Sequence, residues 1–381
     1  MVTDPPAADA PDVSIIVPAL NEGENIPLLL PRLAAAMNGR SYEVLIVDDA
    51  SRDRTPQVCH ELSKTYPLKL LVREHPKYGL SGAVLHGIAA ARGRTLVVMD
   101  ADLQHPPERV PALLEALDDS ANGVDFALGS RYVPGGSTDD RWTLFRKINS
   151  WVATFLARPF AGNVRDPMSG FFALRRSTFD RAQRLTPLGY KIALELMCKC
   201  RVRNVREIPI HFGLRTKGES KLTLKQQFKY LEHLSRLYDF TFPRASPISK
   251  FSIATIMGLI VGLGVFIALS STGSGRIAAT IWGYFFSILV TAVFHVRYVR
   301  TQREFLLTQH PWIHFTVISG AEWLAAILSV WWLARRATAA SGVEVFLISF
   351  GCATVVRYAL RKEFLEDVRG LRKEIRPEEL L

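Results

Sequence analysis

Residues 96 to 108 read Leu-Val-Val-Met-Asp-Ala-Asp-Leu-Gln-His-Pro-Pro-Glu, an apolar run that changes abruptly into a polar turn. The first four residues predict a short buried strand. Because side chains alternate along an extended chain, the carboxylates of Asp100 and Asp102 can converge, and Gln104 adds a neutral oxygen. Hard oxygen ligands suit Mg2+ or Mn2+, which keep open positions for substrate phosphates. The stretch therefore predicts a metal site, with a solvated acidic turn as the plain alternative.

Short apolar runs alternate with amphipathic stretches through the first part of the chain. The predicted strands are 13–17, 44–47, 68–72, 96–99 and 126–129, and the helical stretches between them include 26–37 and 55–66. Such alternation predicts an α/β fold with a parallel sheet covered on both faces. Ligands of open α/β sheets bind beyond the carboxyl ends of the strands. The polar pairs that follow the first, second and fourth strands lie at that edge: Asn21-Glu22, Asp48-Asp49 and Asp100-Asp102.

The composition favours an anionic partner and gives no sign of a disulfide framework. The 381 residues include 47 Lys and Arg against 36 Asp and Glu, a formal charge of +11. This surplus is typical of proteins that bind nucleotides, phospholipid surfaces or nucleic acid. The four cysteines are scattered, and the Cys198/Cys200 pair lacks a second pair or a nearby histidine. We therefore expect these two cysteines to be apolar filler on a helix.

The composition changes near Pro247, beyond which four long apolar segments follow one another. They comprise residues 251–271, 277–296, 313–333 and 343–360. Because about 20 apolar residues span a bilayer, we expect four transmembrane helices. Arg297, Arg300 and Arg303 between the second and third segments, with a basic tail after the fourth, place both termini in the cytoplasm by the positive-inside rule. The predicted outer connections hold arginines that argue the other way: Arg276, Arg335 and Arg336.

Two features near the membrane segments leave alternatives open. Glu322 lies inside the third segment, where an acidic side chain is a functional candidate by default. Packing against a serine, a tryptophan or Arg357 is the structural alternative. Residues 222–242 predict a basic amphipathic helix, which either lies in the membrane interface or packs on the core of the preceding domain.

The pattern divides the chain into five parts. We expect a disordered tail at 1–12, a catalytic domain at 13–221 and amphipathic helices or a linker at 222–247. A four-helix transmembrane domain at 248–362 and a basic cytoplasmic tail at 363–381 complete the prediction.

Six sequence blocks in a fixed order carry a family resemblance. They are Ile-Ile-Val-Pro-Ala-Leu-Asn-Glu (15–22), Ile-Val-Asp-Asp-Ala-Ser-Arg-Asp-Arg-Thr (46–55), Met-Asp-Ala-Asp-Leu-Gln-His-Pro-Pro-Glu (99–108), Gly-Ser-Arg-Tyr (129–132), Asp-Pro-Met-Ser-Gly-Phe-Phe-Ala-Leu-Arg (166–175) and Phe-Gly-Leu-Arg-Thr-Lys-Gly-Glu-Ser-Lys-Leu (212–222). Residues 13–238 thereby resemble the dolichol-phosphate mannose synthase group of family 2 glycosyltransferases, which implies a GT-A type nucleotide-binding sheet. The four-helix part resembles the GtrA-like membrane domain.

The resemblance implies transfer of mannose from GDP-mannose to a polyprenyl (dolichyl-type) phosphate. The implied enzyme is a multi-pass protein of the cell membrane that inverts the sugar and works at the cytoplasmic face. Since a phosphate monoester has a second pKa of about 6, such an acceptor is already anionic and needs no general base. The protein must instead bring two anions together, which calls for a metal and several cationic side chains.

The resemblance also implies roles for individual residues. The donor nucleotide would lie against Pro18, Leu20, Glu22, Val47, Asp49, Asp100 and Ala101, although the family often has tyrosine where Leu20 stands. The metal, Mg2+ or Mn2+, would be held by Asp100, Asp102 and Gln104. The acceptor phosphate would be held by Arg131, Arg146, Ser150, Arg215 and Lys221, with Asp166 either ordering that site or forming a turn. The residues implied to be catalytic are Asp100, Asp102, Arg131 and Arg215.

The sequence leaves two other functions open and disfavours a third. The same chemistry could use UDP-glucose or another nucleotide sugar as donor. A chain of another class would bind or translocate the lipid carrier without catalysis. Nucleic-acid binding is disfavoured, because the basic residues cluster beside the apolar segments rather than with stacking aromatic residues.

Overall fold

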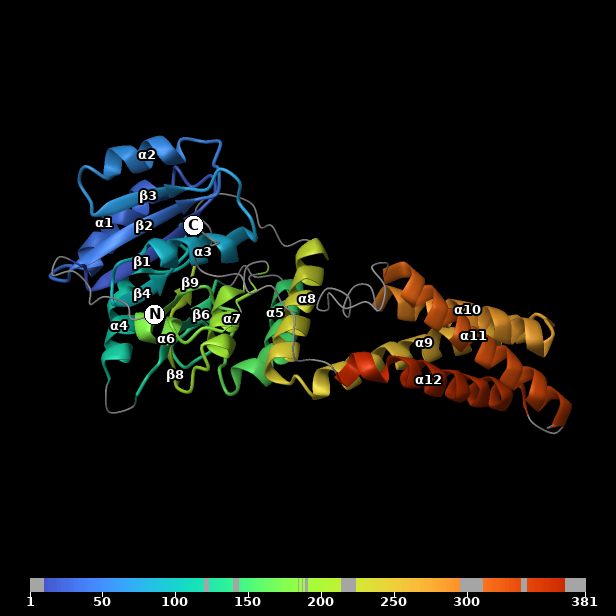
Figure 1. The fold of residues 1–381 in the computed structure, drawn as a ribbon. Coiled ribbons are helices and arrows are strands. Elements are labelled where there is room, and N and C mark those ends of the chain that lie inside the picture. Colours follow the sequence, from blue (N-terminus) through green and yellow to red (C-terminus); the bar gives the residue numbers. More distant parts are fainter. Residues whose placement is uncertain are drawn as a thin grey trace. The chain divides into compact units, whose positions relative to one another are not determined.

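The computed structural model divides the chain into two compact units, with the boundary between Leu237 and Tyr238. It describes residues 10–119, 123–139, 144–183, 185–186, 188, 191–213, 224–294, 311–336 and 341–366. Figure 1 shows the first unit as a sheet with helices and the second as a set of long helices. Most of the expected N-terminal tail, the arginines at 297, 300 and 303, and most of the basic C-terminal tail lie outside these residues.

A seven-stranded sheet forms the centre of the first unit, in the order β3-β2-β1-β4-β7-β5-β8. Its strands are β1 (Val13–Ala19), β2 (Tyr42–Asp48), β3 (Leu68–Val72), β4 (Thr95–Val98), β5 (Phe126–Ser130), β7 (Phe172–Arg175) and β8 (Val205–Pro209). The strands β1 to β4 are parallel, as predicted, and β5 is parallel to β8. The sheet is mixed, however, because β7 runs antiparallel to both β4 and β5. A small second sheet pairs β6 (Ser137–Thr138) with β9 (His211–Phe212).

Helices cover both faces of the large sheet (Figure 1). They are α1 (Ile26–Ala36), α2 (Thr55–Leu62), α3 (Gly79–Ala90), the 3-10 turn η1 (Pro107–Arg109), α4 (Val110–Asp118), α5 (Leu144–Ala161), α6 (Arg176–Phe179) and α7 (Ile192–Lys199). The alternation of β1 explains the two layers: Ile15 and Val17 join one apolar core with α1 and α4, and Ile16 joins the other with α3 and α7. Every residue of β1 is buried, as expected of a parallel strand covered on both sides.

Helix α8 (Leu224–Thr241) confirms the predicted helix and buries one face. Tyr230, Leu234 and Leu237 lie in the second apolar core, which supports the core-packing alternative for this face. Phe228 and Leu231 are exposed on the helix, so membrane contact by the outer face stays a prediction.

The second unit contains α9 (Ala245–Ser271), α10 (Arg276–Phe294), α11 (Pro311–Arg336) and α12 (Gly342–Glu366). Within the described residues, four helices are long and apolar enough to cross a membrane, as predicted: Ile248–Ser271, Arg276–Val293, Thr316–Leu333 and Gly342–Ala359. Inside the unit, Arg357 NH1 lies 3.2 Å from Glu322 Oε1, and both side chains are buried. Glu322 therefore has Arg357 as its partner, which is the structural alternative that was left open from the sequence.

Candidate functional site

Two loops at the carboxyl ends of β1 and β2 are joined by side chain to backbone hydrogen bonds. The register of the two strands sets Pro18 beside Val47. The Asn21 N–H donates to Ser51 Oγ at 2.8 Å, and the Glu22 N–H donates to Thr55 Oγ1 at 2.9 Å. These bonds satisfy backbone donors outside the sheet and fix the loop that carries Glu22. Leu20 lies next to these hydrogen bonds and is 41% exposed, so its side chain is at the outer edge of the loop.

The consecutive acids Asp48 and Asp49 have different partners. Asp48 is buried and accepts hydrogen bonds from the Ser51 N–H and hydroxyl, which makes it the turn residue of this loop. Asp49 Oδ1 accepts a hydrogen bond from Arg73 NH1 at 2.8 Å. Burial and the neighbouring Asp48 raise the pKa of Asp49, although Arg73 acts in the opposite direction. Arg73 was missed from the sequence, where it belongs to no recognisable motif.

The loop after β4 arranges the predicted metal ligands. The backbone turns at Leu103, which has a φ of +63° in the left-handed region. The Gln104 N–H donates to Asp102 Oδ1 at 3.2 Å, and Gln104 Nε2 donates to the carbonyl of Gly213 at 2.9 Å. Asp102 is nearly buried, whereas the side chain of Asp100 is 32% exposed. In the part of the chain that the structure describes, no three His, Cys, Asp or Glu side chains form a metal site, so the candidate set is two carboxylates and one amide.

His105 orders this loop, a role that was not predicted. Its Nδ1 accepts a hydrogen bond from the Asp100 N–H at 2.9 Å. The ring stacks on Phe171, with centroids 5.2 Å apart, and meets Phe212 edge-on. Burial lowers the pKa of His105 to about 4, so the ring is neutral near pH 7 and its 3.7 Å approach to Asp100 Oδ2 is no ion pair. The sequence signal was its position next to Gln104.

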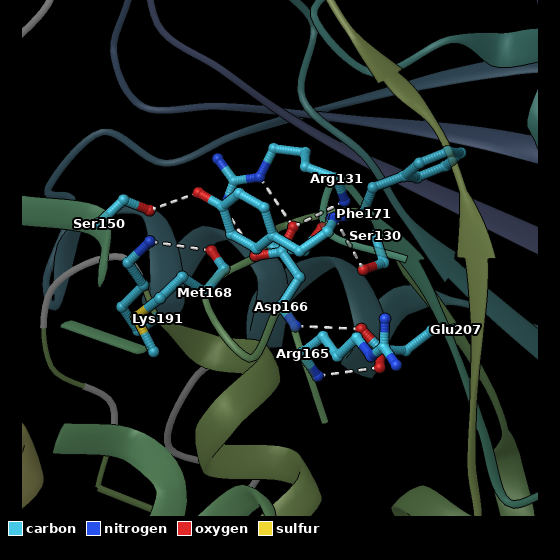
Figure 2. Close-up of polar contacts among 11 residues, drawn as sticks. Ser130, Arg131, Ser150, Arg165, Asp166, Met168, Phe171, Lys191 and Glu207 are labelled. Atoms are coloured by element: carbon cyan, nitrogen blue, oxygen red, sulfur yellow. Dashed lines mark hydrogen bonds and ion pairs between the residues drawn. The ribbon is translucent and has the colours of Figure 1, made fainter. Parts of the chain in front are cut away.

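A buried ion pair joins Arg131 to Asp166 (Figure 2). Arg131 Nε and NH2 each donate to an Asp166 carboxylate oxygen at 2.7 Å, and the Arg131 backbone N–H donates at 3.0 Å. Asp166 has no exposed surface. Burial acts to lower the pKa of Arg131, but hydrogen bonds and charge from Asp166 outweigh it and raise the pKa. Asp166 thus orders the predicted acceptor site by fixing Arg131, with two of the five guanidinium N–H groups committed to it.

Lys191 lies in the same group and was not predicted (Figure 2). It precedes α7, and its Nζ donates to the carbonyl of Met168 at 2.9 Å. Burial and the positive charge of Arg131 lower the pKa of Lys191 to about 7, although Asp166 and Asp100 raise it. The amine is therefore within electrostatic range of both the Arg131 pair and the carboxylate loop.

The predicted acceptor residues are only partly placed. Ser150 Oγ and the Tyr132 hydroxyl are 2.8 Å apart, and the Arg131 guanidinium lies 5.2 Å from the Tyr132 ring centroid. Ser150 and Arg131 are thereby linked through one tyrosine. Arg146 belongs to α5, but its side chain is outside the described part of the structure, as are Arg215 and the loop with Gly218 and Lys221.

Acidic and cationic groups lie close together at the ends of the strands. A Cβ added at Gly170 would lie 3.4 Å from His105 Cε1 and 3.7 Å from Asp100 Oδ2. Carboxylates on one side can balance a divalent cation, and Arg131 with Lys191 can balance phosphate oxygens on the other. The arrangement suits a reaction between two anions.

Comparisons with known proteins identify the family of this chain. Residues 14–182 match the family model of Glycosyl transferase family 2. The dolichol-phosphate mannosyltransferase of Pyrococcus furiosus is 44% identical over 255 residues, which cover 66% of this chain and 70% of that protein. The Saccharomyces cerevisiae dolichol-phosphate mannosyltransferase is 42% identical over 242 residues, covering 61% and 88%. The solved glucosyl-3-phosphoglycerate synthase of Mycobacterium tuberculosis, in complex with Mn2+ and UDP, is 19% identical with a TM-score of 0.46 and covers 60% and 79%.

Proposed function

Because the chain belongs to Glycosyl transferase family 2, and within it to the dolichol-phosphate mannosyltransferases, we propose that it transfers mannose from GDP-mannose to a dolichyl-type polyprenyl phosphate. The products are polyprenyl-phosphate mannose and GDP. One observation supports this most: the carboxylate loop of Asp100 and Asp102 adjoins the buried Arg131–Asp166 pair and Lys191. That is the inventory needed to join two phosphate-bearing substrates.

The acceptor phosphate is itself the nucleophile. Its oxygen forms a bond to C1 of mannose while the bond from C1 to the diphosphate oxygen breaks, and that electron pair leaves with GDP. No proton has to be removed, since the monoester is already anionic above its second pKa of about 6. The reaction is a single in-line displacement with inversion at C1 and no covalent sugar–enzyme intermediate.

The donor nucleoside is held at the ends of β1 and β2. The buried strand ends at Pro18 and Val47 support the site from below, Leu20 lies at its edge, and the carboxylates of Glu22 and Asp49 accept N–H groups of the base and hydroxyls of the ribose. The bond from Arg73 fixes the Asp49 carboxylate in one orientation. Ala101 and Asp100 bring the diphosphate end of the donor to the β4 loop.

The residues of the β4 loop fit a divalent cation. Asp100, Asp102 and Gln104 would hold Mg2+ or Mn2+, which supplies positive charge for the departing diphosphate. The two carboxylates give the charge, and the hydrogen bonds from Gln104 to Asp102 and Gly213 fix the ligand set. His105 holds the Asp100 backbone as a neutral acceptor, so it adds no competing positive charge.

The acceptor phosphate is held by Arg131, with Lys191 as an additional cation beside it. Asp166 is a positioning residue, because it acts on the phosphate only through Arg131. Ser150, Arg146, Arg215 and Lys221 complete the set proposed from the family resemblance. The four long apolar helices make this a membrane protein, and we place its catalytic unit on the cytoplasmic face of the cell membrane.

Substitution of Asp102 separates an enzyme from a non-catalytic carrier binder. In membranes containing the full chain, Asp102→Ala is expected to lower mannose transfer by about 10²–10³-fold, as loss of charge stabilisation does elsewhere. Glu115→Ala, which removes an exposed acid of α4, is the matched control and should retain the wild-type rate. Equal transfer by both variants would contradict the proposed role of the β4 loop.

A further inference from the structure

An apolar cleft of about 70 Å³ lies between α10 and α11 of the second unit. One side is formed by Ile277, Ile281 and Tyr284, and the other by Ile327, Val330 and Trp331. These positions are one turn apart along each helix, so the cleft follows the seam between the helices. A cavity whose volume is measured in the same way needs about 10–15 Å³ to hold one water molecule. The cleft is several times larger, so it can accept several methylene groups of a hydrocarbon chain.

The mouth of the cleft is open and apolar. Ile277 at one rim is 52% exposed, and Trp331 at the other is 49% exposed. Both belong to helices long and apolar enough to span a membrane. In a bilayer, hydrocarbon chains rather than water surround such a rim.

A group of arginines stands at the same end of the cleft. The guanidinium carbon of Arg335 lies 3.8 Å from the Trp331 ring centroid, directly beside the cleft. The guanidinium carbon of Arg336 lies 5.3 Å from the Trp332 ring centroid. Arg276 begins α10, one residue before the rim residue Ile277. Within the described residues, Arg335 and Arg336 have no ion-pair partner.

We propose that this end of the second unit is a binding site for an anionic phospholipid. One hydrocarbon chain lies in the α10–α11 cleft, and the phosphate is held by Arg335 and Arg336. The stacked indoles hold the two guanidinium planes, which leaves their N–H edges for phosphate oxygens. Charge complementarity selects the occupant: an apolar cleft alone accepts any lipid, whereas arginines at its rim favour a negative headgroup.

A lipid site here also gives a physical reason why arginines occur on connections that were predicted to lie outside the membrane. These arginines lie on the connections predicted to be outside, where the positive-inside rule disfavours them. A lipid phosphate neutralises them on either side of the membrane. The proposal is independent of the glycosyltransferase reaction and of its orientation.

The test is lipid retention by the purified full chain in a neutral detergent. Phosphatidylglycerol, phosphatidylcholine or polyprenyl phosphate is added, and bound lipids are counted by native mass spectrometry. The variants are Arg335→Gln/Arg336→Gln, which removes the charges, and Ile277→Trp, which narrows the cleft with the arginines intact. Arg40→Gln/Lys64→Gln removes two exposed charges of the first unit and is the matched control.

The wild type and the control should retain phosphatidylglycerol in preference to phosphatidylcholine. The double arginine variant should bind phosphatidylglycerol more weakly, by about fivefold for each arginine lost. The Ile277→Trp variant should also lose binding of phosphatidylglycerol, because the cleft is narrowed. Equal retention of the two phospholipids, unchanged binding by the double arginine variant, or retention of polyprenyl phosphate alone would each overturn the proposal.

Discussion

Asp166 lies completely buried beside Arg131, and its two carboxylate oxygens accept both Nε–H and NH2 of that arginine at 2.7 Å. The backbone N–H groups of Arg165 and Asp166 are in turn held by Glu207. The arginine proposed to bind the acceptor phosphate is therefore fixed before any substrate arrives. This preorganisation lowers the cost of bringing the two anions together.

Asp166→Asn tests this relationship. The amide cannot balance the guanidinium charge, so we expect the variant to be less stable by about 3–5 kcal/mol, the usual cost of breaking a buried pair. Transfer should fall at least tenfold, because Arg131 loses its fixed orientation. Arg131→Lys keeps the charge but loses the paired geometry, so its transfer should also fall. Wild-type melting temperature and rate in Asp166→Asn would contradict the assignment.

Lys191 predicts a pH dependence of the transfer rate. Since burial lowers its pKa to about 7, the amine is charged below that pH and neutral above it. We expect kcat/KM for GDP-mannose to fall as the pH rises through about 7, where the free enzyme loses this charge. Lys191→Arg stays charged and should move the fall to higher pH, whereas Lys191→Met should be slow throughout.

The lowered pKa of Lys191 also predicts that stability changes with pH in the direction opposite to the transfer rate. The unfolded lysine has a pKa of about 10.4, so between about pH 7 and 10.4 the unfolded chain binds more protons than the folded one. The contribution of Lys191 to stability should therefore rise with pH over this range while activity falls. A rate and a stability that fall together above pH 7 would show unfolding rather than the loss of a catalytic charge.

Glu195 predicts a stability loss at acidic pH. Its Oε1 lies 2.7 Å from Lys199 Nζ, and its Oε2 lies 3.5 Å from Nε2 of His233 on α8. Burial opposes ionisation of Glu195, but His233 and Lys199 outweigh it and lower the pKa to about 2. A depressed carboxylate pKa stabilises the fold above about pH 4.3, and this stabilisation is lost as the pH falls towards 2.

Glu195→Gln should remove the loss of stability at acidic pH that arises from the Glu195 carboxylate. It removes the carboxylate that is paired with the buried Lys199, so at neutral pH the free energy of unfolding should fall by about 3–5 kcal/mol. Glu195→Leu/Lys199→Met removes both charges and should recover much of the loss. Thermal unfolding at several pH values measures both effects, and a single variant as stable as the double one would rule out the pair as a stabilising contact.

Substitutions of Glu322 and Arg357 test whether this buried ion pair of the second unit has a structural role. Glu322→Gln leaves Arg357 unpaired among the apolar helices, where Thr255 accepts its remaining hydrogen bond at 2.5 Å. We expect lower membrane yield and lower thermal stability from either single variant, with recovery in Glu322→Leu/Arg357→Met. Full stability of the double variant together with lost transfer would instead assign the pair a function. Unchanged yield and activity in Glu322→Gln would end both interpretations.

The sequence predicted those parts of the fold whose signals are local. Apolar runs such as Val13–Ala19 and the four spanning helices follow from hydrophobicity alone, and the order of acids after the strands gave the candidate site, which stays a prediction. The antiparallel strand β7 was missed because its four residues carry no pattern that distinguishes direction. Strand direction depends on which distant segments pair, and here β7 inserts between β4 and β5.

The missed site residues share one property. Arg73, His105 and Lys191 each act through a contact with a distant segment or a backbone atom, such as the bond from Lys191 to the Met168 carbonyl. A lone lysine at the start of a helix has no sequence signal for its position beside Arg131. Asp166 was named from its block, but its paired contact with Arg131 is visible only in the structure.

The most direct test of the proposed function is the transfer of radiolabel from GDP-mannose to a lipid-extractable product. Membranes containing the full chain are supplied with polyprenyl phosphate, with and without EDTA, and UDP-glucose is tested in parallel. We expect a mild-acid-labile lipid product from GDP-mannose that requires polyprenyl phosphate and disappears with EDTA. Label from UDP-glucose but not from GDP-mannose would contradict the proposed donor, and no label from either would contradict the proposed reaction.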